Sequence, residues 1–323
     1  EGPIRSGVTA ILPRGIHGYD RVFAATYAFN GNGEMTGAAW IRESGFLEGP
    51  VVLTNTHSVG TAMEAVVKWS IQNAPGTDVV SLPVVIETWD GGLNDINGFH
   101  VRSEHVWAAL EEATGGPVAE GNIGGGTGMR AFGFKAGIGT SSRLAHTDAG
   151  TFVVGVLVQA NFARRQHLVI AGIPVGREIT DLMPIIQTNP PGNGSLAAVV
   201  ATDAPLLPHQ LERLAKRVSL GMARTGTPSM NSSGDFFIAF STFEPEGIGH
   251  SPLISTRFLD TRALDPLFEA TIHATEEAIL NSLVAAETMT GINGNTYFAL
   301  PHKRVREILA AHDRLGQVQV ATP

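Results

Sequence analysis

The sequence predicts a layered α/β or α+β domain, on the strength of two observations. Short apolar or alternating runs bounded by Gly, Pro, Asn or Asp predict strands, and longer amphipathic runs predict helices. Because sheets and helices each bury one apolar face against another element, this mixture predicts sheets that are covered by helices. The 323 residues suit one large domain or two small ones, and 43% of them are apolar, which is ample for a buried core.

The first half of the chain is predicted to consist mainly of strands joined by Gly-rich turns. The predicted strands are Val8–Leu12, Arg21–Phe29, Val51–Thr54, Pro83–Thr88, Met129–Phe134 and Thr151–Phe162. Two helices are expected between them. One covers about His57 to Asn73, and the other starts at Ser103, a favourable N-cap, with Val106 and Leu110 on one face.

The second half is predicted to contain long helices beside two buried strands. The elements are a strand over Leu196–Thr202, a helix from Pro208, a strand over Asp235–Thr242, a long helix opened by Asp265 and Pro266, and a last helix around Val305. The helix from Pro208 carries an apolar stripe of Leu211, Leu214, Val218 and Met222. This stripe predicts that the helix packs on a sheet.

Composition excludes several classes of function. The chain has no Cys, which rules out disulfides, zinc-thiolate sites, iron–sulfur clusters and a cysteine nucleophile. A net charge of −8 argues against a general nucleic-acid binder. No apolar run approaches the length of a membrane span, and no signal-peptide pattern is visible, so we expect a soluble protein with no membrane partner. The chain begins at Glu1 without Met, which predicts a trimmed or incomplete start.

The segment Gln187–Gly194, QTNPPGNG, divides the two halves and leads directly into the strand that follows Ser195. The simpler interpretation is an exposed loop or domain boundary before an ordinary strand. The alternative is an N-terminal nucleophile. A Ser fixed at a strand start can attack the carbonyl that precedes it, and hydrolysis of the resulting ester gives Ser195 a free α-amine. Such an amine, with an ordinary pKa of about 7.7–8.0, can act as a general base near neutral pH.

Other polar or Gly-rich positions are weaker candidates. Gly121–Gly128, GNIGGGTG, resembles a phosphate loop, but a β-like run follows it and no Walker lysine is present. We therefore expect a loop whose backbone N–H groups line a site rather than a nucleotide site. Glu87, Trp89 and Asp90 cluster at a strand end, and Asn161 ends another strand, where its amide is a cap or an oxyanion donor.

Five segments together resemble the DmpA family of self-processing serine aminopeptidases, which includes the β-peptidyl aminopeptidases. They are TNTHSVG at Thr54–Gly60, ETWDGGLNDINGFHV at Glu87–Val101, AEGNIGGGTGM at Ala119–Met129, GNGSLAAVVATDAPLLPHQLERLAKR at Gly192–Arg217 and SSGDFFIAFST at Ser232–Thr242. The resemblance runs from near residue 8 to beyond residue 300, and the segment at Gly192–Arg217 is highly specific. Members of the family have one further strand-and-turn segment before the position of Glu1.

The resemblance implies an α+β fold, a four-layer αββα sandwich like that of N-terminal-nucleophile hydrolases but with different connectivity. It implies a single domain over residues 1–323 that cleaves itself between Gly194 and Ser195 into an α chain, 1–194, and a β chain, 195–323. The two chains are expected to stay together in a homo-oligomer, a tetramer of such heterodimers. No cofactor and no metal are implied.

The resemblance also implies roles for individual residues. Ser195 corresponds to the nucleophile and Asn161 to the oxyanion donor, while Ser233 and Asp235 correspond to the pair that orients the nucleophile and its amine. Some members have Glu where this chain has the shorter Asp235.

Two further positions match substrate-binding residues of the family. Glu87 falls where members that cleave β-peptides bind the substrate ammonium, and Trp89 falls where the aminopeptidase with D-esterase activity has Tyr. The implied function is release of N-terminal L-, D- or β-amino acids from short peptides, amides or esters with a free amine. The alternatives are an amidase of the same family acting on a non-peptide amide, and a non-enzymatic small-molecule-binding module whose loop stays intact.

Overall fold

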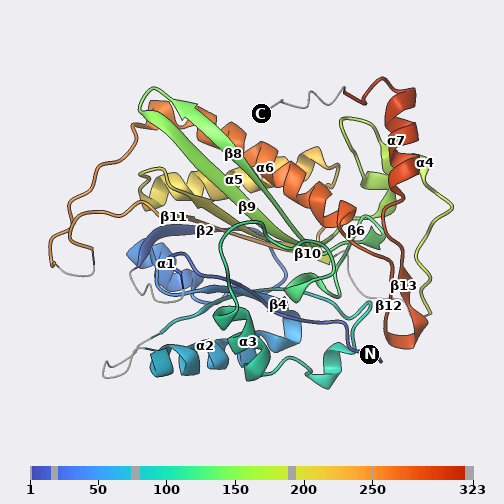
Figure 1. The fold of residues 1–323 in the computed structure, drawn as a ribbon, viewed down its shortest axis with the longest axis horizontal. Helices are drawn as coiled ribbons and strands as arrows, with labels where there is room; N and C mark the ends of the chain where they lie inside the picture. Colours follow the sequence, from blue (N-terminus) through green and yellow to red (C-terminus); the bar gives the residue numbers. More distant parts are fainter. Residues whose placement is uncertain (1, 16–20, 74–80, 188–193, 249–250, 317–323) are drawn as a thin grey trace.

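Four layers of secondary structure stack on one another in the computed structural model, which describes residues 2–15, 21–73, 81–187, 194–248 and 251–316. Helices α2 and α3 form one outer layer and helices α5 and α6 form the other, with two sheets between them (Figure 1). This arrangement confirms the expected αββα sandwich.

The smaller sheet has three strands in the order β1-β4-β5. Its strands are β1 (Thr9–Ile11), β4 (Val51–Asn55) and β5 (Val84–Thr88), and the helices on its outer face are α2 (Val59–Asn73) and α3 (Ser103–Glu111). The strand β4 is antiparallel to β1 and parallel to β5. All five residues of β5 are buried, because the sheet is covered on both faces, which explains the apolar run Val84–Ile86.

The larger sheet has six strands in the order β3-β2-β11-β10-β9-β8. Its strands are β3 (Phe46–Leu47), β2 (Val22–Gly31), β11 (Gly234–Ser241), β10 (Gly194–Thr202), β9 (Gly150–Phe162) and β8 (Ile138–Thr147). Only β10 and β11 are parallel, and the other neighbours are antiparallel. The predicted nucleophile therefore lies on a central strand.

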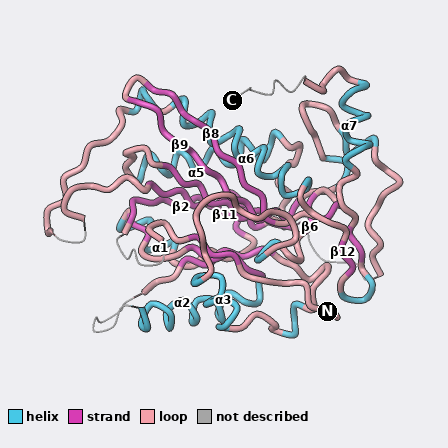
Figure 2. Tube along the Cα trace, in the orientation of Figure 1, coloured by secondary structure: helices cyan, strands magenta, loops and turns pink. Residues whose placement is uncertain are grey.

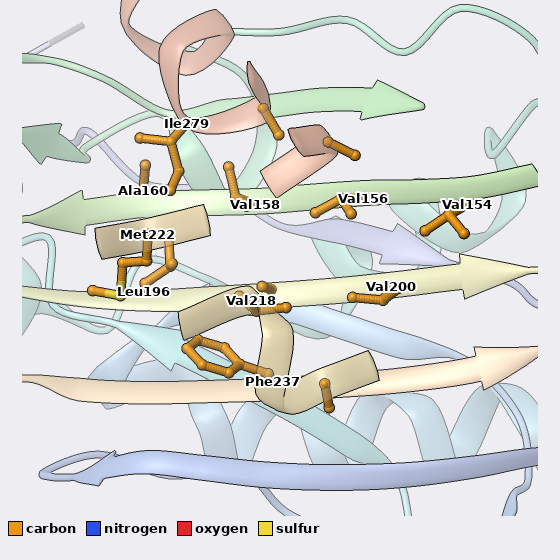
Figure 3. Packing of buried hydrophobic residues seen from close by; sticks show 14 of the residues in the cluster. Val154, Val156, Val158, Ala160, Leu196, Val200, Val218, Met222, Phe237 and Ile279 are labelled. Carbon is orange, nitrogen blue, oxygen red and sulfur yellow. The ribbon is translucent and has the colours of Figure 1, made fainter. Parts of the chain in front are cut away.

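Helices α5 (Pro208–Arg224) and α6 (Asp265–Val284) cover the outer face of the larger sheet. Figure 3 shows Val218 and Met222 of α5 and Ile279 of α6 packing on Val156, Leu196 and Phe237 of the sheet, all of them buried. The predicted stripe Leu211, Leu214, Val218 and Met222 is fully confirmed. A separate apolar layer, including Leu53, Ile86, Val199 and Ile238, fills the space between the two sheets.

Shorter elements surround the layers (Figure 2). They are α1 (Ala38–Ser44), β6 (Arg130–Ala131), β7 (Phe134–Lys135), α4 (Val175–Glu178), β12 (Met289–Thr290), β13 (Thr296–Tyr297) and α7 (His302–Ala311), together with six short 3₁₀ turns. Among the residues with described structure, no helix combines the length and apolar character needed to cross a bilayer.

Two local predictions are wrong, and two elements were not predicted. The single strand over Met129–Phe134 is a hairpin, because Phe132 (φ 52°) and Gly133 (φ 67°) turn the chain between β6 and β7. Ser103 is the first residue of α3, not its N-cap; the N-cap is Arg102, and its N–H donates to the His105 ring at 3.0 Å. The long strand β8 and the helix α1 were not predicted; in β8, polar residues such as Thr140, Ser141 and Ser142 interrupt the apolar pattern.

Candidate active site

Ser195 lies at the start of β10, in the middle of the larger sheet. It is 5% exposed, and its Oγ accepts a hydrogen bond from the Gly234 N–H at 3.1 Å. Antiparallel pairing of β10 with β9 sets Ser195 opposite Asn161. The hydroxyl is therefore bonded to the backbone of β11, while the Ser195 backbone pairs with β9.

Gly194 adopts a conformation that only glycine adopts without strain. Its φ is +83°, in the left-handed region, and a Cβ at this position would lie 1.7 Å from the Asn161 carbonyl oxygen. Most of the predicted linker Gln187–Gly194, residues 188–193, lies outside the described residues. The glycine before Ser195 is thus required by the close approach of β9.

The Asn161 side chain is fully buried and fixed at both ends. Its Oδ1 accepts from the Arg130 N–H at 3.2 Å, and its Nδ2 donates to the Trp89 carbonyl at 2.8 Å. A side-chain amide has two N–H groups, so one remains to donate elsewhere. The strand-end cap and the oxyanion donor are therefore compatible roles for the same amide.

Asp235 is fully buried beside the nucleophile strand. Its Oδ1 accepts from the Leu196 N–H at 2.9 Å and from the Ser233 hydroxyl at 2.8 Å. Its Oδ2 accepts from Asn30 Nδ2 at 3.0 Å and from the Ser229 hydroxyl. Four donors around one carboxylate compensate its burial and fix its orientation.

Glu87 is the penultimate residue of β5, with 3% of its surface exposed. Its Oε1 accepts from the Glu34 N–H at 3.1 Å, and its Oε2 accepts from the Thr56 hydroxyl. Burial raises the pKa of the Glu87 carboxyl above its usual value, because the charged form loses hydration, although both hydrogen bonds oppose this change.

Gly33 lies between Glu87 and the backbone that holds Ser195. A Cβ at Gly33 would lie 2.6 Å from Glu87 Oε1 and 3.6 Å from the Gly234 Cα, and the Gly234 N–H is the group that donates to Ser195. The structure thus brings Glu87 to the same end of the larger sheet as Ser195.

Trp89 contacts Asn161 through its backbone and Gly91 through its ring. Its carbonyl accepts from Asn161, and its indole lies against Gly91, where a Cβ would come within 2.4 Å of the ring. All six predicted site residues, Ser195, Asn161, Ser233, Asp235, Glu87 and Trp89, therefore belong to one connected cluster, together with the cleavage-site residue Gly194.

The Gly-rich loop Gly121–Gly128 was expected to line a site with its backbone N–H groups, but it does not line this one. Its glycines allow close packing: a Cβ at Gly125 would lie 2.0 Å from Gln159 Oε1, and one at Gly126 would lie 2.3 Å from the Ile138 nitrogen. The Gly121 N–H donates to the Ile138 carbonyl and the Gly125 N–H to the Thr9 hydroxyl, while the N–H groups of Ile123, Gly126 and Thr127 donate to carbonyls within the loop. The loop is a packing element between the two sheets.

Several contributing residues were not singled out from the sequence. Asn30, Ser229 and Gly234 complete the surroundings of Asp235 and Ser195, and Thr56 holds Glu87. Of these, Thr56 and Gly234 lie inside segments that carry the family resemblance. Asn30 and Ser229 carry no comparable signal, because only the folded chain brings them to Asp235.

Comparison with known proteins agrees with this geometry. The model of peptidase family S58 matches residues 1–297. The β-peptidyl aminopeptidase BapA of Sphingosinicella microcystinivorans is 49% identical over 329 residues, which covers 98% of this chain and 83% of that protein.

Two solved structures share the fold at high sequence identity. The L-aminopeptidase D-Ala-esterase/amidase from Ochrobactrum anthropi, a prototype for the serine aminopeptidases and a variant of the Ntn hydrolase fold, superposes with a TM-score of 0.91 at 45% identity, covering 98% of this chain and 88% of that one. A Burkholderia sp. β-aminopeptidase superposes with a TM-score of 0.86 at 43% identity, covering 96% and 87%. The chain therefore belongs to peptidase family S58, the DmpA family, and is a serine aminopeptidase with a variant of the Ntn hydrolase fold.

Proposed function

We propose that the chain cleaves its own Gly194–Ser195 bond and that Ser195 then acts as the N-terminal nucleophile of the aminopeptidase. The Ser195 Oγ attacks the Gly194 carbonyl carbon, and the hydroxyl proton passes to the departing amide nitrogen, which gives an ester. Water hydrolyses the ester and leaves a Gly194 carboxylate and a free Ser195 α-amine. Residues 1–194 and 195–323 then form two chains of one domain.

The observation that carries this proposal is the junction itself. A left-handed Gly194 packs against the Asn161 carbonyl, and the next residue places its hydroxyl on the rung shared with Asn161. A nucleophile held in this way needs no further ordering before it reacts, which lowers the entropic part of the barrier.

In the proposed peptidase reaction, the Ser195 α-amine takes the hydroxyl proton as Oγ attacks the substrate carbonyl. The remaining Asn161 N–H stabilises the oxyanion, and the amine then protonates the leaving group. Water releases the acyl group by the same steps in reverse order. Ser233 and Asp235 orient the start of β10, through the bond from the Leu196 N–H to Asp235.

In this proposal, Glu87 makes the enzyme selective for substrates with a free N-terminal amine. A buried carboxylate beside the nucleophile binds a substrate ammonium through a charge-assisted hydrogen bond, whereas an N-acetylated substrate offers no cation. We expect N-acetylated peptides not to be cleaved. We assign Trp89 to substrate binding, because its carbonyl bonds the Asn161 amide and its indole N–H can donate a hydrogen bond but cannot exchange a proton.

The substrate class is proposed from the relatives. The chain is 49% identical to a β-peptidyl aminopeptidase and 45% identical to an L-aminopeptidase D-Ala-esterase/amidase. We expect short substrates with a free N-terminal amine, with β-amino acids among the residues released. A panel of aminoacyl p-nitroanilides with L-, D- and β-homo residues tests this directly.

Intact mass measurement and a denaturing gel test self-cleavage. The expected result is two polypeptides, the second beginning at Ser195, together with turnover of free-amine substrates. A purified protein that stays a single polypeptide and binds a small molecule without turning it over contradicts the proposal.

We also propose that the heterodimers assemble into a homo-oligomer, a tetramer of heterodimers. A cleft of about 930 Å³ opens between β1 and the β8–β9 hairpin, away from Ser195, and Val118 and Ile123 line it with 47% and 44% of their surface exposed. Leu144 (61%) and Val153 (42%) on the hairpin extend this exposed apolar surface, which is typical of a subunit interface. Light scattering coupled to size-exclusion chromatography measures the oligomeric state, and a mass equal to one heterodimer contradicts the proposed assembly.

A further inference from the structure

Arg130 is a buried cation beside the proposed catalytic cluster. The residue is 8% exposed, and its N–H donates to Asn161 Oδ1, so it adjoins the proposed oxyanion donor. Its Nε is buried without a hydrogen-bond partner, and the guanidinium forms no ion pair within the described part of the chain. The guanidinium carbon lies 5.6 Å from the centre of the Tyr297 ring, which is a weak substitute for an anion.

Two other buried cations nearby, unlike Arg130, have several hydrogen-bond acceptors. Lys135 donates to the carbonyls of Gly126, Met129 and Ala136. Arg165 donates to four carbonyls, those of Phe132, Gly133, Ile179 and Leu182, at 2.7–2.9 Å. The fold thus provides acceptors for these cations, whereas no acceptor among the described residues bonds the Arg130 Nε. A buried guanidinium N–H without an acceptor is costly, and a bound anion would supply the acceptor.

The strand order places Arg130 on the leaving-group side of the site. Gly33 packs against both Glu87 and Phe236, so Glu87 lies over β11. Ser195 lies on the next strand, β10, and Asn161 on the one after, β9. The segment of Arg130 follows on the far side of β9, where the Phe132 N–H donates to the Phe162 carbonyl at 2.9 Å.

We propose that Arg130 binds a carboxylate on the leaving portion of the substrate, namely the free C-terminus of a dipeptide or tripeptide. The inference rests on the proposed function, in which Glu87 holds the substrate ammonium and Ser195 attacks between the two charged ends. Guanidinium and carboxylate are both planar and pair through two parallel hydrogen bonds, so this anion suits the site better than a spherical one.

The spacing limits substrate length. Neighbouring strands lie about 4.8 Å apart, so β11 and the Arg130 segment are separated by about 14 Å. In the proposed complex, the Glu87 and Arg130 side chains and the substrate's terminal groups cover part of this distance. Each extended residue spans about 3.5 Å, so a substrate of two or three residues bridges the two charges. Longer peptides would place their carboxylate beyond Arg130.

A matched pair of substrates tests the proposal: a dipeptide with a free carboxylate and the same dipeptide as its C-terminal amide. Both carry the N-terminal residue that the p-nitroanilide panel shows to be best cleaved, and product formation is followed by chromatography. We expect the wild-type protein to favour the acid over the amide by about 10- to 100-fold in kcat/KM, as a hydrogen bond to a charged group gives.

Variants assign the preference to Arg130. Arg130→Gln should bring the acid-to-amide ratio close to one, and Arg130→Lys should keep part of it, since a lysine supplies charge without the planar fork. Arg304→Gln removes a comparable positive charge at the surface, where Arg304 pairs with Asp181, and should leave the ratio at the wild-type value.

The outcomes separate this inference from the proposed function. Equal cleavage of acid and amide by the wild-type protein overturns the role of Arg130 and leaves the aminopeptidase standing. A wild-type ratio that survives in Arg130→Gln also overturns it. Failure to cleave either dipeptide or any p-nitroanilide overturns the proposed function and this inference with it. Because the wild-type comparison needs no variant, the test stands even where Arg130→Gln does not fold.

Discussion

Asn161 faces Ser195 directly across the antiparallel pair β9 and β10. The proposed nucleophile and the proposed oxyanion donor are therefore fixed by one rung of a sheet rather than by loops. On the next rung, Gly194 packs closely against the Asn161 carbonyl and leaves no room for a Cβ.

Ser195→Ala should leave a full-length, folded and inactive protein, because the same hydroxyl serves self-cleavage and acyl transfer. Loss of a covalent nucleophile costs several powers of ten in rate, so the result is not marginal. Mass spectrometry and the p-nitroanilide assay measure both effects. Ser219→Ala, which removes only a hydroxyl bonded to the Lys216 carbonyl on α5, is the matched control and should be cleaved and active. Wild-type turnover by Ser195→Ala would end the hypothesis.

Asn161→Ala should lower kcat by about 10²–10³, with slower self-cleavage, because both reactions pass through an oxyanion at the same place. Asn281→Ala removes an amide that donates to the Thr140 carbonyl at 2.8 Å, away from the site, and controls for the loss of a structural hydrogen bond. A lower melting temperature with an unchanged kcat would show that Asn161 only caps the strand.

Gly194→Ala should block self-cleavage without changing the nucleophile. A methyl group at this position would overlap the Asn161 carbonyl oxygen, and the left-handed φ of +83° disfavours alanine. The junction must therefore move away from its native geometry. Gly172→Ala, at another left-handed glycine (φ +82°) where a Cβ meets nothing within 4 Å, is the control for backbone strain alone. Normal cleavage of Gly194→Ala, seen on a denaturing gel, would show that this geometry is not needed.

Glu87→Gln should raise KM for free-amine substrates by about 10- to 100-fold, the loss expected for a hydrogen bond to a charged group. The amide keeps the shape of the site, because its oxygen accepts from the Glu34 N–H and the Thr56 hydroxyl rotates to accept from its nitrogen. An unchanged KM would assign Glu87 a purely structural role.

The effect of Glu87→Gln on kcat/KM should become smaller as the pH falls. The raised pKa of this carboxyl means that it loses its charge at a higher pH than an ordinary Glu as the solution becomes acidic. The ratio of kcat/KM between wild type and Glu87→Gln cancels titrations that the two proteins share, such as that of the Ser195 amine. It should be constant at neutral pH and fall towards one on acidification. A ratio independent of pH would contradict the role of the charge.

Asp90→Asn should stabilise the protein at neutral pH. Burial raises the pKa of Asp90 to about 6, although hydrogen bonding opposes this change; Asn94 donates to its Oδ1 at 3.1 Å, and its buried Oδ2 has no hydrogen-bond partner among the described residues. Between pH 4 and 6 the folded chain holds a proton that the unfolded chain has released, so stability falls as pH rises and the cost is complete above pH 6. Two pKa units correspond to about 3 kcal/mol, the upper limit of the gain.

Unfolding of Asp90→Asn is best measured in the uncleaved Ser195→Ala background, where a single polypeptide unfolds. The variant should match its parent near pH 4 and exceed it in free energy of unfolding at pH 7.5. Equal stability at both pH values would contradict the burial argument.

The layers were predictable because each strand and helix buries a recognisable apolar face. The stripe from Leu211 to Met222 and the apolar run Val84–Ile86 of β5 are two examples. β8 was not predicted because one of its faces is polar, which hides the apolar pattern of a strand. Its pairing with β9 identifies it, and that pairing cannot be seen in the sequence of β8 alone. The hairpin at Phe132 escaped because a bulky residue rarely takes a positive φ.

The site was predictable to the extent that its residues stand in motifs. Ser195, Ser233 and Asp235 come from two segments that resemble the family, whereas Asn161 was recognised by its place at a strand end. Arg130 gives no signal in the sequence, where an arginine is expected to face solvent. Only the count of its neighbours' donors and acceptors shows that it lacks a counterion.

The position of β10 inside the larger sheet has a consequence for the life of the protein after cleavage. Its strand pair β10–β11 comes from residues after Gly194, and the neighbours on both sides, β9 and β2, come from residues before it. Maturation at this bond would turn an intramolecular sheet into one interleaved from two separate polypeptides, each of which completes the other. Folding of the precursor is unimolecular, but reassembly after denaturation would require the fragments to meet in solution and would depend on concentration. The mature protein would then persist through slow unfolding rather than through easy refolding.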